Sequence, residues 1–127
     1  MLLRSGIARR MFNASEVLVP AIKLTSLPGI FIDEEADSVT YYHLLFDRHE
    51  ILFAEGAPTE SLLTGPQALK SLPPQARREI LSIFPELADL DAPPKGARLI
   101  PNGRQQNRLI ARHLKNRRPC IEPLPPP

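Results

Sequence analysis

The stretch "YYHLLFDRHEILFAEGAPTES", residues 41–61, carries the clearest signal for the fold of this chain. Two apolar runs flank a charged centre, and turn-forming residues follow the second run, beginning at Gly56. Apolar runs bounded by such residues are typical of a β-hairpin. Folding about Arg48–His49 would place Leu44 opposite Phe53 and make both faces mostly apolar. The stretch therefore predicts a central hairpin with an exposed charged tip, ended by the turn "GAPTES".

The residues before this hairpin also predict strands. Val17–Leu24 is an apolar run followed by the turn sequence "SLPG", and the letters "GIFI" at 29–32 can form another short strand. Short strands separated by turns are typical of antiparallel β folds. We therefore expect residues 1–65 to form a β domain made of antiparallel hairpins.

After Gly65 the pattern becomes helical. Ser71 and the prolines that follow it predict a helix start, and Pro85 should break or kink that helix. One face of it would hold Ala76, Ile80, Ile83 and Leu87. A further helix is expected at 104–116, before a Pro-rich end. The predicted fold class is mainly β with two or three C-terminal α-helices, divided into a domain at 1–65, a helical extension at 66–118 and a disordered tail at 119–127.

The predicted helix and the two residues after it form a basic segment, 104–118, called the basic helix, which allows two interpretations. Its basic side chains are Arg104, Arg108, Arg112 and Lys115, and its apolar edge is Leu109, Ile110 and Leu114. Three aliphatic side chains could dock it on a core with the basic side in water. Alternatively, the basic side and the Pro-rich tail could dock an acidic protein. Nucleic acid is the weaker candidate, because aromatic residues are few and no nucleic-acid-binding motif accompanies the charges.

Composition narrows the chemistry further. A single cysteine, Cys120, excludes an internal disulfide and a multi-cysteine zinc site. The three histidines show no metal-binding spacing, so we predict neither a metal nor another cofactor. No secretory signal or membrane-spanning stretch is visible, and the net charge of +2 does not indicate a polyanionic partner by itself.

The segment "VTYYHLLFDRHEILFAEGAPTESLLTG" resembles the closing hairpin of the Hint (hedgehog/intein) domain family, and most closely a bacterial subgroup often found in large, secreted proteins. The earlier segment "MFNASEVLVPAIKL" is similar to the strand that precedes that hairpin. This resemblance implies an all-β, horseshoe-like fold that rearranges its own backbone. A Cys or Ser at the first residue of the domain attacks the preceding carbonyl, and a T-x-x-H element assists.

The chain departs from this pattern in its chemical groups. Met1 is not a nucleophile, and "MLLRSGIARRMF" resembles what directly follows the family's histidine element, so that element is missing. At 59–61, where inteins have a His-Asn pair, no residue can cyclise as Asn does. We therefore expect the C-terminal portion of a Hint domain, derived from a self-cleaving module but inactive as this chain. If completed upstream, it would cleave its own upstream polypeptide by an N–S or N–O acyl shift.

His49 and Asp47 are the catalytic candidates. The resemblance places His49 where many family members have a polar residue that assists the first acyl shift, although a histidine at a loop tip is often only solvated. We expect His43 to be a core histidine with its hydrogen bonds satisfied. A triad of Ser61, Glu60 and either His49 or His43 can be imagined, but the G-x-S-x-G elbow is absent, so the "GAPTES" segment is better explained as a turn.

Overall fold

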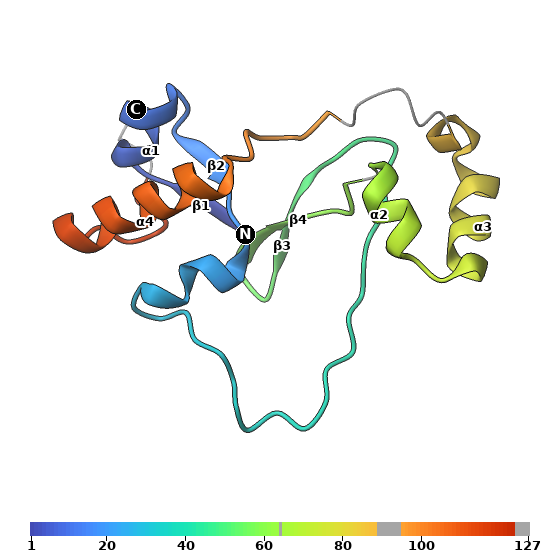
Figure 1. Cartoon of the computed structure of the whole chain (residues 1–127), viewed down its shortest axis with the longest axis horizontal. Coiled ribbons are helices and arrows are strands. Elements are labelled where there is room, and N and C mark those ends of the chain that lie inside the picture. Colours follow the sequence, from blue (N-terminus) through green and yellow to red (C-terminus); the bar gives the residue numbers. More distant parts are fainter. Residues whose placement is uncertain (64, 89–94, 124–127) are drawn as a thin grey trace.

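The computed structural model describes residues 1–63, 65–88 and 95–123. The elements in these ranges, shown in Figure 1, are β1 (Leu2–Arg4), α1 (Gly6–Phe12), β2 (Glu16–Leu18), the 3₁₀ helix η1 (Ala21–Ser26), β3 (Ile51–Ala54), β4 (Ala57–Glu60), α2 (Pro66–Ser71), α3 (Pro74–Ile83), the 3₁₀ helix η2 (Pro85–Ala88) and α4 (Gly103–Asn116).

The first eighteen residues form a small antiparallel pair joined by a helix. β1 pairs with β2 from Leu2↔Leu18 to Arg4↔Glu16. The Ser5 hydroxyl starts α1 by accepting the Ala8 N–H at 3.1 Å, and Asn13 ends α1 at a φ of 54°. A side-chain oxygen at the N-cap satisfies an N–H that the helix itself leaves unpaired, which is why a helix begins immediately after β1.

The hydrophobic core lies where β1, β2, α1, η1 and α4 meet. Its buried residues are Leu3, Ile7, Ala8, Val17, Val19, Leu24, Leu27, Leu109 and Ile110. Helix α4 contributes through one face, while the four basic residues on its other side are exposed. This confirms a docked surface helix, although Leu114 is 46% exposed and only two of the three expected aliphatic residues are buried.

The C-terminal part of the chain extends the β1–β2 pair on both edges. The Leu18 N–H donates to the Leu99 carbonyl at 2.9 Å. On the other edge, Arg4 donates its N–H to the Cys120 carbonyl and accepts the Glu122 N–H, each at 2.8 Å. Residues 120–122 of the expected disordered tail are thus paired with β1, while residues 124–127 of that tail lie outside the described part.

The predicted hairpin about Arg48–His49 is wrong. The hairpin is β3–β4, with Ile51 opposite Glu60, and its turn is at Glu55 and Gly56. Both turn residues have positive φ, 52° and 80°. Two such residues in succession match the twist of paired strands, and this local preference decides where the chain reverses. Gly56 therefore makes the turn itself instead of ending the hairpin.

The expectation of a mainly β chain is also wrong. The four described strands have only three or four residues each, whereas α3 has 10 and α4 has 14. Of the run Val17–Leu24, only the first two residues belong to a strand, because Pro20 precedes a 3₁₀ helix and has no N–H to pair. Residues 27–50, including "GIFI", form no helix or strand. Apolar periodicity predicted extended chain there, but a strand needs a partner to pair with.

Helices α2 and α3 lie apart from the core in Figure 1. Ser71 ends α2 instead of capping α3, which begins at Pro74. Helix α3 ends at Ile83, so the expected break before Pro85 is confirmed. No residue of α3 is buried. Among the described helices, none has the length and apolar character that crossing a membrane requires.

Candidate functional site

His49 is buried, with a side chain only 1% exposed, although the sequence placed it at a solvated loop tip. It lies two residues before β3. Its Nε2 is 2.7 Å from Glu60 Oε2. Its Nδ1 accepts the backbone N–H of Ala97 at 2.8 Å. Both ring nitrogens therefore have a partner.

These two partners define the protonation of the ring. An amide N–H can only donate, so Nδ1 carries no proton, and Nε2 then donates its N–H to Glu60. A carboxylate that holds a neutral histidine in one tautomer is the arrangement found behind a histidine acid–base catalyst. In this structure, however, the second nitrogen faces an amide N–H and not a free space.

Glu60 reaches His49 because of the hairpin register. The two-residue turn pairs Glu60 with Ile51, which places it beside the residues just before β3. Its side chain is 40% exposed and borders a groove of about 700 Å³ that also touches Tyr42 and Phe53. Its negative charge also acts on the amino group of Met1, whose pKa burial lowers and Glu60 partly restores. The amino group of Met1 thus lies within electrostatic range of Glu60.

The other candidate residues from the sequence are either exposed or hydrogen-bonded to the backbone. Asp47 is exposed, in a bend before His49. His43 is exposed as well, so the expected core histidine is wrong. Ser61 is buried, but its hydroxyl accepts the Glu50 N–H at 2.9 Å. The serine triad considered from the sequence is therefore not observed. His49 and Glu60 are hydrogen-bonded to each other, and Ser61 is not part of that pair.

A second histidine, His113, is also buried, and its burial was not predicted from the sequence. His113 of α4 is fully buried, and its Nε2 is 2.9 Å from the Ser5 hydroxyl oxygen. That oxygen already accepts the Ala8 N–H, so the hydroxyl proton is free to be donated to His113. Nδ1 lies 3.3 Å from the Arg118 carbonyl. Burial lowers the pKa of His113, which keeps the ring neutral.

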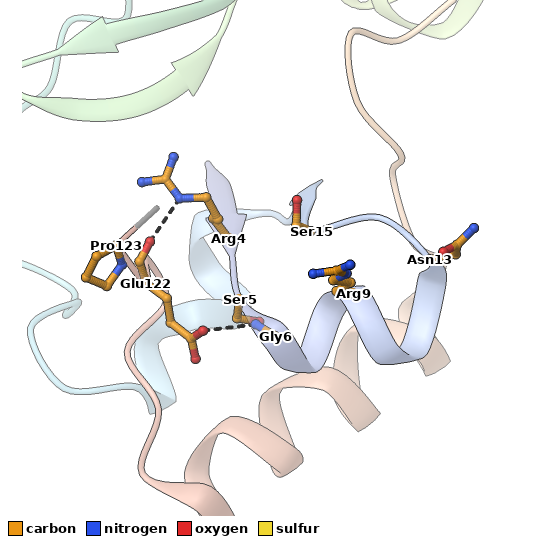
Figure 2. Close-up of a pocket in the computed structure, with 8 residues that line it drawn as sticks. All are labelled: Arg4, Ser5, Gly6, Arg9, Asn13, Ser15, Glu122 and Pro123. Atoms are coloured by element: carbon orange, nitrogen blue, oxygen red, sulfur yellow. Dashed lines mark hydrogen bonds between the residues drawn. The ribbon is translucent and has the colours of Figure 1, made fainter. Parts of the chain in front are cut away.

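Figure 2 shows the surroundings of Ser5, where the C-terminal segment meets β1 and α1. Glu122 accepts the Arg4 Nε–H at its carbonyl, at 2.9 Å, and the Gly6 N–H at its carboxylate, at 3.0 Å. The adjoining cavity, about 600 Å³, is bordered by Arg9 and Asn13. These contacts account for how the C-terminal segment is held on the N-terminal one.

From the sequence, Glu60 was considered beside a histidine only as part of a serine triad that was then set aside, and Ala97 was not considered at all. The Glu55–Gly56 dipeptide was the available signal, since a turn placed there would have given the register that pairs Glu60 with Ile51. No pattern connects Ala97 with a residue 48 positions earlier. Among the described residues, no cluster of three or more side chains suited to a metal ion is found.

The chain was compared with known protein families, curated proteins and solved structures. The family described as the Hint domain matches residues 1–66. No curated protein and no solved structure matches the chain.

Proposed function

We propose, from the premise that this chain belongs to the Hint domain family, that it supplies the C-terminal portion of an autoprocessing module of the bacterial type. In this proposal the chain carries the histidine site of the module and does not cleave a peptide bond by itself. The hydrogen bond of 2.7 Å between His49 and Glu60 carries the proposal.

The His49–Glu60 pair has the properties that an acyl shift requires. The shift needs a group that gives a proton to the leaving amide nitrogen, and a histidine oriented by a carboxylate can do this. The backbone nitrogen of Met1 is held by the Val19 carbonyl at 2.9 Å, in the neighbourhood on which the charge of Glu60 acts. A peptide joined to residue 1 would therefore enter the protein near this pair.

Two features support inactivity of the 127 residues alone. Neither nitrogen of His49 is free, and the Ser61 hydroxyl is bonded to the Glu50 N–H. The thiol of Cys120 borders a cavity together with His113 and not with His49. Within the described part of the chain, neither the Ser61 hydroxyl nor the Cys120 thiol is hydrogen-bonded to His49, which supports the proposed inactivity.

Exposed apolar side chains support the proposal that the module is partial. Several lie in the irregular segment before β3: Phe31, Ile32, Val39, Tyr41, Tyr42, Leu44 and Phe46, between 41% and 86% exposed. So many exposed large apolar side chains within one segment are unusual for a chain that folds alone, and such side chains often mark a surface that meets another protein segment. In a complete module, the missing part of the fold would cover it.

The first test asks whether an upstream segment restores cleavage. A reporter protein and a Hint N-terminal portion, starting with Cys and containing T-x-x-H, are fused before Met1, and release of the reporter by added thiol is followed by mass spectrometry. We expect release from the fusion and an unchanged mass for the 127-residue chain. His49→Ala should slow release about 100-fold, which is typical of losing a general acid or base.

Matched variants separate the roles of the residues. His43→Ala removes an exposed histidine and should leave the rate unchanged. Glu60→Gln should slow release by less than His49→Ala, because the ring remains while its orientation weakens. Asp47→Asn tests the second candidate and should have a smaller effect still. Cleavage of the 127-residue chain alone would refute its inactivity, and equal rates for His49→Ala and the parent fusion would refute the role of His49.

A further inference from the structure

We infer that residues 96–99 form a strap that keeps His49 in a resting state, and that His49 can exchange a proton with a peptide only after the strap moves away. The role of this strap in controlling His49 rests on the proposed function. The geometry of the strap and the labelling test described below are independent of that function.

The strap makes three contacts within four residues, one with His49 and two with strand β2. The Ala97 N–H occupies His49 Nδ1 at 2.8 Å. Arg98 Nε lies 3.5 Å from Glu16 Oε1 of β2. The Leu99 carbonyl accepts the Leu18 N–H at 2.9 Å, which adds one parallel bridge to the edge of β2. One short segment thus covers both the histidine and the strand beside it.

Gly96 leaves room for the backbone of the strap itself. A Cβ at this position would lie 3.0 Å from the Arg98 carbonyl oxygen, which is a tight approach, and 3.8 Å from His49 Nδ1, which is an ordinary contact. A side chain here would therefore require the Arg98 carbonyl to shift slightly but would not meet the ring.

The contacts that hold the strap are weaker than the hydrogen bond between His49 and Glu60. Arg98 and Glu16 form a partly exposed ion pair, and such pairs contribute little. Leu99 and Ile100 are 47% and 46% exposed. Segments with few buried contacts open locally at low free-energy cost. The His49–Glu60 bond, in contrast, is fixed by the register of β3–β4 and would survive such an opening.

Opening would change the chemistry of His49 at one atom. With the strap in place, the lone pair of Nδ1 accepts the Ala97 N–H and the proton of Nε2 is donated to Glu60. With the strap away, Nδ1 could take a proton, and Glu60 would stabilise the resulting imidazolium through Nε2. The same proton could then be given to a leaving amide nitrogen.

The test measures how fast diethyl pyrocarbonate modifies each histidine of the 127-residue chain, read out by peptide mass spectrometry. In the parent protein His43 should react fastest, because it is exposed, while His49 and His113 are buried. Ala97→Pro removes the N–H that faces His49 and should raise the modification rate of His49 about fivefold, as expected for loss of one hydrogen bond. The rates of His43 and His113 should not change.

Two further variants keep the test decisive. Ala97→Ser retains the N–H and should label like the parent. Replacing the amide that joins Gly96 to Ala97 by an ester removes the same N–H without a proline ring and should label like Ala97→Pro. If His49 stays protected in both the proline and ester variants, with their circular dichroism unchanged, the strap does not control it. Parent His49 reacting as fast as His43 would also overturn the inference.

Failure of the strap and failure of the proposed function give different results. In the fusion protein, Ala97→Pro should accelerate reporter release if both hold. Labelling that changes as expected, with no release from any fusion, supports the strap and refutes the autoprocessing role. Release that depends on His49 but is the same for the parent and Ala97→Pro refutes the strap and keeps the role.

Discussion

His49 and His113 are both buried histidines with two hydrogen-bond partners, but their surroundings prepare them for different tasks. His49 has the Glu60 carboxylate on one nitrogen and the Ala97 amide on the other, which fixes the orientation of its ring. His113 has a hydroxyl and a carbonyl, and burial lowers its pKa. Proton chemistry at His49 stays part of the proposed function, whereas His113 joins α4 to the start of α1 as a neutral group.

His113 predicts a pH dependence of stability. Its pKa in the folded chain is lowered from 6.5, so the unfolded chain binds more protons as the pH falls below that value. Stability is therefore fully present above about pH 6.5 and is lost as the pH falls towards the folded-state pKa. Urea unfolding of the parent and of His113→Gln at about pH 7 and about pH 5 should show a smaller loss in the variant.

The exposed histidine provides the control. His43→Gln should keep the parent's loss of stability on acidification, because His43 is in contact with water. A loss of the same size in His113→Gln and in the parent would contradict the assignment.

At the scale of single elements, the β3–β4 turn determines the site more than any strand does. The turn sets which residue stands opposite Ile51, and that residue is the partner of His49. A shift of one residue would move Glu60 to the other face of the hairpin. The hydrogen bond between His49 and Glu60 is therefore a consequence of the backbone conformation at two positions.

Gly56→Ala should test the turn. At a φ of 80°, an L-residue with a Cβ is strained, and the free energy of unfolding should fall by about 1 kcal/mol or more. Glu55→Asn, at a φ of 52°, places a residue that tolerates positive φ and should leave stability unchanged or slightly raised. Thermal or urea unfolding measures both. An equal effect of the two substitutions would show that backbone strain does not govern this turn.

At the scale of the whole molecule, the two ends of the chain form one unit. Helix α4, more than 75 residues after η1, completes the core around Leu24, and residues 99 and 120–122 pair with the outer edges of β1–β2. The matched Hint region, 1–66, thus does not bury its core by itself. The predicted domain boundary at residue 65 stays a prediction. The docking of an acidic partner by the basic helix also stays a prediction.

Leu109→Ala should test this dependence. Leu109 is fully buried in the shared core, so its truncation should lower the free energy of unfolding by about 2–5 kcal/mol. Leu114→Ala, on the same helix but at a residue 46% exposed, should change it by about 0.5 kcal/mol or less. Unfolding monitored by near-ultraviolet circular dichroism distinguishes the two. Similar values for both would show that α4 is not part of the core.

Local signals in the sequence determined the parts that depend on neighbouring residues. The last helix was predicted within one residue of its start because the spacing of its basic and aliphatic residues is a local signal. Helix α3 ends before Pro85 because proline cannot continue a helix. The family resemblance identified the Hint family and drew attention to His49. Tertiary structure alone decided the rest: the register that gives His49 its carboxylate, the amide of Ala97 on its other nitrogen, and the pairing of Ser5 with His113. Those partners lie 11, 48 and 108 positions apart, and such contacts form only when packing brings distant segments together, which local propensity does not encode.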